Sequence, residues 1–197
     1  MKKSIIIITA VAVLIALANI KDISAVPTFA SEKYLPIYNV QTEENKVAFT
    51  MNCAWNADDI DSILETLKNN DVHITFFIVG DWADKYPEAV KKISDAGHEA
   101  FIRSAKSASH VPIQWNLDTV DYTGITGDEM WKRLENKLSG GSIILMHNGT
   151  KHTADSLDML IKNIKSKDYD IVTVSNLIYK DGYYIDNNGT QRLNNNV

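Results

Sequence analysis

Polar side chains of the kinds that do chemistry follow several short apolar runs of this sequence. They are Asn52, Trp55, Asp81, Trp82, Asp118, Asp121 and His147. Aspartate and histidine at such positions can take up and release protons during a reaction. A single polar residue after a strand is more often a helix cap, so the inference depends on how many strands end this way. Four of them do, and we therefore expect a catalytic rim.

The segments that carry these residues alternate between strand and helix patterns. Short β-branched, aromatic or apolar runs predict strands at 47–51, 73–79, 111–115, 142–146 and 171–174. Apolar residues at helical spacing predict helices at 58–69, 86–96, 127–138 and 153–167, and a closing turn at 175–179. This alternation predicts an α/β fold of mostly parallel strands with outer helices. In such folds the carboxyl ends of the strands hold the site.

The composition is that of an acidic globular protein. The chain has 197 residues, which suits one domain, and a formal net charge of −5. It has no cluster of Lys and Arg, so we expect no nucleic-acid partner. Its one cysteine, Cys53, excludes an intrachain disulfide and a zinc site built from several cysteines.

The N-terminus has the pattern of an export signal. Lys2 and Lys3 precede an apolar run at 5–18, which is short for a membrane-spanning helix and long enough for a signal peptide. A buried core helix is the alternative interpretation. We expect residues 1–25 to be a signal peptide or membrane anchor. The protein is then secreted, or anchored on the outer face of the cytoplasmic membrane through this segment alone.

The rest of the chain divides by composition into three parts. Residues 26–45 mix prolines with polar residues and have the pattern of a linker or arm. Residues 46–180 contain the alternating pattern and form the expected domain. Residues 181–197 form a polar tail, in which Asn188-Gly189 can turn a small hairpin.

Four short motifs occur in an order that is typical of one known family. They are Thr75-Phe76-Phe77, Gly97-His98-Glu99, Asp118-x-x-Asp121-Tyr122 and Leu145-Met146-His147. The blocks 46–99 and 112–178 resemble the opening and the close of NodB-homology polysaccharide deacetylases, carbohydrate esterase family 4. The Ala54-Trp55 pair is similar to the exported group of spore-forming bacteria. The resemblance implies a distorted (β/α) barrel, which in this chain is shortened.

The resemblance also implies an activity and a cofactor. Enzymes of this family remove acetyl groups from N-acetylglucosamine units in peptidoglycan or chitin-like polymers. They use zinc or another divalent metal, held by one aspartate and two histidines. The metal activates water, a carboxylate takes the water proton and a histidine protonates the leaving amine. A cell-wall polysaccharide is the partner that this resemblance implies.

Two of the family's motifs are missing from this chain, and a third is altered. Asn52 falls at the position of the base, and an amide accepts no proton near neutral pH. Cys53 falls at the position of a metal ligand, where we expect a buried thiol. No His-x-x-x-His pair follows Glu99, and no Arg-Pro-Pro-Tyr motif is present, since Arg103 lies in a segment with a helical pattern. A Cys53 thiolate could bind zinc, but without the two histidine ligands such a site would bind the metal weakly at best, and we expect no cofactor in this chain.

The remaining motifs are retained. Asp118 and Asp121 match the aspartates that tune the catalytic histidine, and His147 matches that histidine. With Asn52 they form the predicted catalytic set. A second set, Trp55, Trp82 and Trp115, could line an aromatic platform for sugar, although core packing is the commoner role of tryptophan.

The length of the domain predicts a gap in the barrel. About two βα units of roughly 30 residues each are missing between residues 99 and 111, and 100–109 has the pattern of one helix that leads into the next strand. An unclosed sheet has exposed edges, through which the chain can associate with itself or with a partner.

Three functions remain open at this point. The first is an exported deacetylase with impaired activity. The second is a non-catalytic protein that binds glycan or cell wall. The third is a shortened, poorly stable family member with no function of its own.

Overall fold

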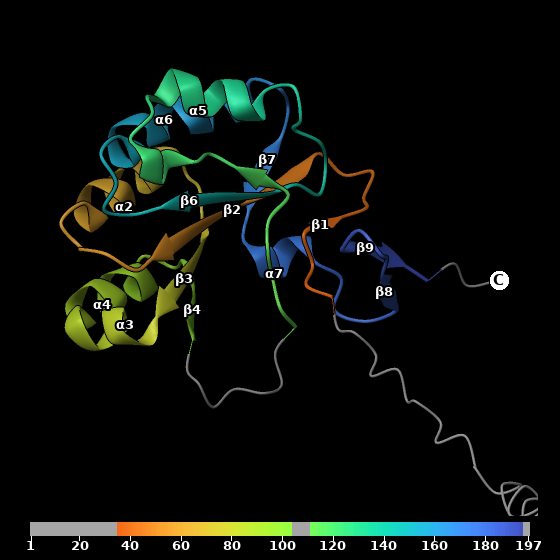
Figure 1. Ribbon diagram of the computed structural model, residues 1–197, viewed down its shortest axis with the longest axis horizontal. Helices are drawn as coiled ribbons and strands as arrows, with labels where there is room; N and C mark the ends of the chain where they lie inside the picture. The colour runs from red at the N-terminus through yellow and green to blue at the C-terminus, as the bar shows by residue number, and fades with distance from the viewer. Residues whose placement is uncertain (1–34, 104–110, 195–197) are drawn as a thin grey trace, which may run out of the picture. The chain divides into compact units, whose positions relative to one another are not determined.

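The computed structural model of the protein describes residues 35–103 and 111–194. Its centre is a six-stranded parallel sheet in the order β4-β3-β2-β6-β5, with β7 also paired to β2 (Figure 1). The strands are β2 (Lys46–Cys53), β3 (Thr75–Val79), β4 (Glu99–Arg103), β5 (Leu117–Asp118), β6 (Ile143–His147) and β7 (Asp170–Val172). The predicted α/β fold with a mostly parallel sheet is confirmed.

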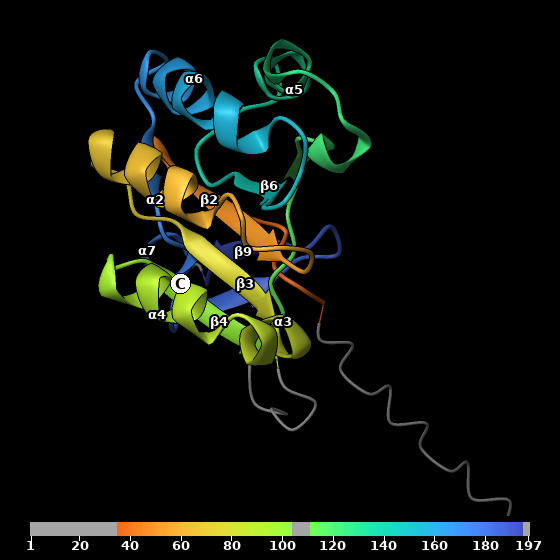
Figure 2. The same ribbon diagram turned by 90° about the vertical axis from the view of Figure 1, so that its left-hand side faces the viewer.

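Helices cover one face of this sheet. They are α2 (Ile60–Asn69), α3 (Gly80–Lys85), α4 (Pro87–Asp95), α5 (Gly127–Leu134) and α6 (Thr153–Lys165), and Figure 2 shows them outside the strands. The short helix α7 (Val174–Leu177) packs into a separate apolar cluster on the other face. None of the helices in the described ranges is long and apolar enough to cross a membrane.

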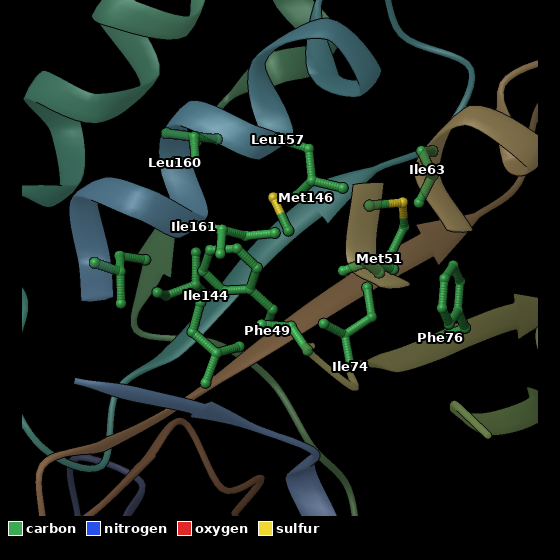
Figure 3. Close-up of a cluster of buried hydrophobic side chains, with 14 of the residues drawn as sticks. Phe49, Met51, Ile63, Ile74, Phe76, Ile144, Met146, Leu157, Leu160 and Ile161 are labelled. Atoms are coloured by element: carbon green, nitrogen blue, oxygen red, sulfur yellow. The ribbon is translucent and has the colours of Figure 1, made fainter. Parts of the chain in front are cut away.

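The core follows from the alternation of side chains along the strands. Phe49 and Met51 of β2 point toward the helices, where Ile144 and Met146 of β6 meet Leu157 of α6 (Figure 3). All of these side chains are fully buried. The residues between them point to the opposite face, where the cluster around α7 covers Ala48 and Ile143 at the amino ends of β2 and β6 and extends to Phe77 of β3. The carboxyl ends on that face are therefore left for the site.

The sheet is splayed rather than closed. β7 and β3 both pair with the same edge of β2. β7 pairs with its first residues, Lys46–Ala48, and β3 pairs with its last residues, Thr50–Cys53. Within the described ranges β4 and β5 each have one neighbouring strand, so these strands form an open sheet.

The segments before and after the central sheet pair with each other. β8 (Tyr183–Ile185) and β9 (Thr190–Leu193) form an antiparallel hairpin, and β1 (Asn39–Val40) runs parallel to β9. The predicted turn at Asn188-Gly189 is confirmed, and Gly189 supplies the positive φ of 78° that it requires. β1 comes from the segment 26–45, predicted to be a linker or arm, and β8 and β9 come from the segment 181–197, predicted to be a polar tail. Pairing between distant segments satisfies their backbone hydrogen bonds.

Two predicted elements differ from the structure. The helix expected at 100–109 is the strand β4 up to Arg103, which pairs with β3, and 104–110 lie outside the described residues. The strand expected at 111–115 is reduced to a bridge between Ile113 and Ile37, and β5 begins at Leu117. Both segments are too short for periodicity to separate strand from helix. The predicted signal segment 1–25 also lies outside the described residues.

Candidate functional site

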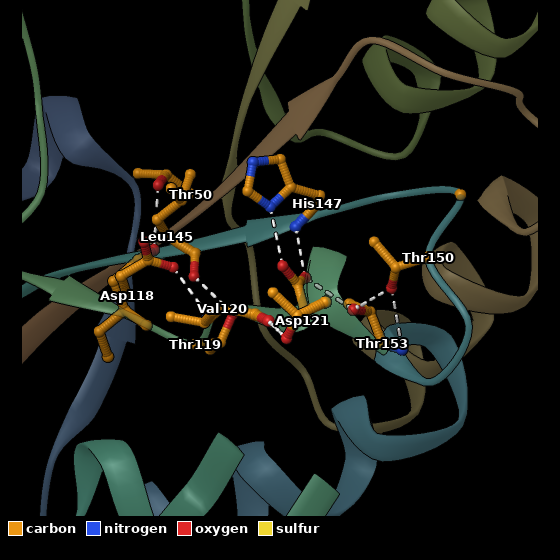
Figure 4. A network of polar contacts seen from close by, with 12 residues as sticks. Thr50, Asp118, Thr119, Val120, Asp121, Leu145, His147, Thr150 and Thr153 are labelled. Carbon is orange, nitrogen blue, oxygen red and sulfur yellow. Dashed lines mark hydrogen bonds and ion pairs between the residues drawn. The ribbon is translucent and has the colours of Figure 1, made fainter. Parts of the chain in front are cut away.

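A histidine and an aspartate meet at the carboxyl end of β6. His147 is the last residue of that strand, and its Nδ1 lies 2.8 Å from Asp121 Oδ1 (Figure 4). The backbone N–H of His147 also donates to Asp121 Oδ2, at 2.7 Å. Asp121 opens the 3-10 turn η2 (Asp121–Thr123) and is fully buried. The structure thus brings together the predicted catalytic histidine and one of the two aspartates predicted to tune it.

The buried carboxylate determines which ring nitrogen of His147 carries the proton. An ionised carboxylate only accepts hydrogen bonds, so Nδ1 must donate to Asp121. Thr153 Oγ1 donates to Asp121 Oδ2 as well, at 2.7 Å, which gives the carboxylate three donors. The other ring nitrogen, Nε2, is left as the free basic atom of the imidazole.

The turn before Asp121 is held in an unusual conformation. Val120 has a φ of 58°, a region that β-branched residues rarely adopt. Its N–H donates to Asp118 Oδ1 at 2.8 Å, and the Thr119 hydroxyl donates to the carbonyl of Leu145 at 2.9 Å. Asp118 was predicted to tune His147. In the structure its side chain contacts the backbone of Val120, in the turn that positions Asp121.

A cavity of about 270 Å³ lies in front of His147. Its lining residues are Asn52, Ala54, Trp55, Phe77, Ile78, Val79 and His147. Asn52 is the cross-strand neighbour of His147 in the parallel ladder, so both side chains point to the same face. The cavity therefore brings the altered end of β2 next to the retained end of β6.

Two exposed aromatic rings flank the imidazole. The ring centroid of Trp55 lies 5.3 Å from that of His147, and the centroid of Tyr122 lies 5.5 Å from it in an edge-on arrangement. About half of each residue is exposed, 48% for Trp55 and 53% for Tyr122. The prediction from sequence did not include Tyr122 as a site residue, although its place directly after Asp121 was a usable signal.

The other two tryptophans do not reach this cavity. Trp82 is 3% exposed, packs into the core under the helices and donates through Nε1 to the carbonyl of Asn56 at 3.1 Å. Its predicted role in binding sugar was wrong, because the turn into α3 carries the ring inward. Trp115 packs against the cluster around α7 and is not part of the cavity lining.

The end of β2 does not fit a zinc site. Cys53 is fully buried on the helical face, and burial, aided by the negative charge of Asp59, raises the pKa of its thiol far above the usual range. The thiolate that zinc requires is therefore disfavoured. Within 35–103 and 111–194 there is no group of three or more His, Cys, Asp or Glu side chains arranged to hold a metal ion.

The glycine-histidine-glutamate segment serves the fold. Burial, together with the charge of His73, lowers the pKa of His98 to about 4, and its Nδ1 accepts the N–H of Ile74 at 3.3 Å. Glu99 accepts the hydroxyl of Thr75 at 2.6 Å and the N–H of Ser175 at 3.3 Å. These contacts join β3 and β4 to each other and to α7, away from His147.

Comparison with known proteins assigns the family. The sequence matches the family described as "Polysaccharide deacetylase" over residues 39–137, half of the chain. The chain therefore belongs to the polysaccharide deacetylases, as the motifs predicted.

Two of the relatives that the chain resembles are proteins of Bacillus species. The chain is 26% identical to the Bacillus subtilis protein YlxY, over 73% of this chain and 60% of that protein. It is 24% identical to a peptidoglycan-N-acetylglucosamine deacetylase of Bacillus cereus, over 74% of this chain and 73% of the relative. The alignment with YlxY runs over 193 residues, more than the covered part of this chain, so that relative has residues with no counterpart here.

Solved structures support the same fold. A CE4 family pseudoenzyme from Bacillus anthracis superposes with a TM-score of 0.66 at 25% identity, over 72% of this chain and 68% of the other. A Bc1960 peptidoglycan N-acetylglucosamine deacetylase superposes equally well, at 24% identity, over 75% of this chain and 94% of the other.

Proposed function

We propose that this chain is a polysaccharide deacetylase-like protein of the cell envelope. Its ligand is a polymer that contains N-acetylglucosamine, peptidoglycan or a chitin-like glycan, and its hydrolysis of the N-acetyl amide is impaired. The observation that carries the proposal is the His147–Asp121 pair beside a cavity lined by Asn52, which stands at the position of the family's base. Cys53, at the position of a metal ligand, is buried in the core instead. Similarity to peptidoglycan deacetylases and to a CE4 pseudoenzyme supports both halves of it.

Each residue of the cavity has a proposed role. When Nε2 carries a proton, His147 gives it to the amide nitrogen as the C–N bond of the water adduct breaks, and Asp121 holds the ring in place. Asn52 hydrogen-bonds the acetamide group, because an amide can donate and accept but cannot serve as a base. Trp55 packs against the apolar face of a sugar ring. Asp118 acts on this group only through the turn before Asp121.

The alternative is a protein that binds glycan without any hydrolysis. The exposed ring of Trp55 beside an intact hydrogen-bonding site favours it. In either case we propose that the protein works secreted or anchored outside the cytoplasmic membrane, with no membrane contact beyond its N-terminal segment. Self-association through the edges of the sheet, at β4 and β5, belongs to the same proposal.

The test combines two measurements on the purified chain. Elemental analysis gives its metal content, and acetate release is followed on chitin oligomers and on peptidoglycan, with His147→Ala as the control variant. We expect substoichiometric metal, acetate release near background and retention on insoluble peptidoglycan. Stoichiometric zinc with acetate release that disappears in His147→Ala would overturn the impaired half of the proposal. A folded chain with neither release nor retention would overturn all of it.

A further inference from the structure

We infer that Thr153 is a positioning residue for the His147–Asp121 pair: it fixes the tautomer of the imidazole by holding the far oxygen of the carboxylate. Thr153 is the first residue of α6 and is fully buried. Its hydroxyl donates to Asp121 Oδ2 at 2.7 Å, whereas His147 Nδ1 lies on Oδ1 at 2.8 Å. The inference rests on the proposed function to the extent that His147 is the group that moves a proton.

The argument begins with the rigidity of a carboxylate. Its two oxygens turn together about the Cβ–Cγ bond, so a contact that fixes Oδ2 also fixes Oδ1. Two donors hold Asp121 Oδ2, the Thr153 hydroxyl and the backbone N–H of His147. The backbone N–H belongs to His147, the residue whose ring is being positioned. Of the two donors, only the Thr153 hydroxyl therefore joins the carboxylate to a different element, α6.

The direction of the Thr153 hydroxyl is itself determined. Thr150 Oγ1 donates to Thr153 Oγ1 at 2.5 Å, and Thr150 in turn accepts the N–H of Thr153 at 3.3 Å. With its oxygen acting as an acceptor for Thr150, Thr153 directs its own proton at Asp121. A chain of hydroxyl donors of this kind strengthens the final hydrogen bond to the carboxylate. Figure 4 shows this chain running from the start of α6 to His147.

This arrangement makes the tautomer of His147 depend on α6. With Oδ1 fixed in front of Nδ1, the proton stays on Nδ1 and Nε2 stays free toward the cavity. Without the Thr153 hydroxyl only the backbone N–H of His147 holds Oδ2, so the carboxylate turns more easily and the contact to Nδ1 weakens. Both tautomers of the neutral ring then become populated.

The test is nitrogen NMR of the full chain labelled with ¹⁵N at histidine, under conditions in which the signals are those of neutral imidazole rings. Signals of His147 are assigned by their loss in His147→Ala. We expect one tautomer, protonated at Nδ1, in the unmodified chain. Thr153→Val and Thr153→Ala should raise the share of the Nε2-protonated tautomer at least threefold, and Thr153→Ser should restore the original state.

A matched control separates positioning from burial. Thr50 is also a buried threonine of this site region, but its hydroxyl donates to the carbonyl of Ile144, at 2.9 Å, and not to Asp121. Thr50→Val should therefore leave the tautomer of His147 unchanged. An unchanged tautomer in a folded Thr153→Val or Thr153→Ala would overturn the inference. Loss of folding in both would overturn it too, because the hydroxyl would then serve the fold alone.

This measurement is independent of turnover. A chain that releases no acetate can still show the Nδ1-protonated tautomer and its loss in Thr153→Val, which would refute activity and leave the inference standing. Acetate release, together with a His147 tautomer that does not change in the Thr153 variants, would support activity and overturn the inference.

Discussion

The two strand ends that border the cavity differ in how much holds their side chains. At the end of β6, His147 and Asp121 are joined by two hydrogen bonds, and further bonds reach α6. At the end of β2, the Asn52 side chain only lines the cavity, and Cys53 points into the core. The retained half of the site is a buried polar network, whereas the altered half is ordinary strand. The difference indicates that the network is also a structural element, whether or not the protein hydrolyses anything.

The largest expected effect comes from removing the centre of the network. Asp121→Ala leaves the N–H and ring of His147 and the hydroxyl of Thr153 without their acceptor, so we expect the free energy of unfolding to fall by about 3–5 kcal/mol. Asp118→Ala removes one backbone contact and should cost about 1 kcal/mol. Urea denaturation measures both. Equal losses in the two variants would contradict the idea of a network centred on Asp121.

The second prediction restores the family's residue at the altered end. Cys53→Asp places a carboxyl group among apolar side chains, and we expect it to lower the free energy of unfolding by about 2–4 kcal/mol. The loss should grow as the pH rises above about 4, because burial raises the pKa of the carboxyl group and disfavours its ionised form. Cys53→Ser is the control, with a smaller and pH-independent cost. A stable Cys53→Asp chain would show that this end still has room for a ligand.

The third prediction is that the loss of stability at acid pH comes from His98 and not from the site around His147. The folded pKa of His98 is about 4 and its unfolded pKa about 6.5, so the unfolded chain takes up the proton first as the pH falls. Stability should be full above pH 6.5 and should fall by about 2–3 kcal/mol between pH 6.5 and 4.

The controls for that titration are two variants, measured by urea denaturation at several pH values. The loss should persist in His147→Ala. It should disappear in His98→Asn, whose side-chain oxygen can still accept the N–H of Ile74. If His147→Ala removes the loss instead, then the network at the end of β6 and not the strand pair β3–β4 is responsible for it.

The smallest effect on stability should come from the exposed aromatic ring. Trp55 is about half exposed, so Trp55→Ala should change the free energy of unfolding by less than about 1 kcal/mol. Its effect on ligand should be larger, and we expect retention on peptidoglycan to weaken about tenfold. Trp115→Ala is the matched control, since Trp115 lies outside the cavity lining. If retention on peptidoglycan weakened equally in both variants, Trp55 would not be part of the proposed ligand site.

Much of the central sheet could be predicted because its strands are continuous apolar runs. The runs in β2, β3 and β6 are buried on both faces, and that alone identifies them. β4 could not be identified, because the five residues Glu99–Arg103 are too few to show a period. The pairing of β1 with β9 joins residues about 150 positions apart, and no local pattern reports such a contact.

Residue types at the strand ends were enough to predict part of the site. The direction in which a side chain points could not be predicted from the sequence. Asp121 and His147 were found because the carboxyl ends of neighbouring strands converge. Trp82 follows a strand as Trp55 does, but a helical turn directs it into the core. Thr153 gave no signal, since a threonine near the start of a helix is common and its contact with Asp121 depends on how α6 packs.

The pairing of β1 with β9 has a mechanical consequence. The two strands are parallel, and β1 is near the beginning of the described chain while β9 is near its end. A force that pulls those ends apart therefore loads the hydrogen bonds between the strands in shear, along their length, so that they must break together. Antiparallel end strands pulled the same way would open one bond at a time. This small sheet therefore resists extension of the chain between β1 and β9 more strongly than its few hydrogen bonds would if they broke in sequence.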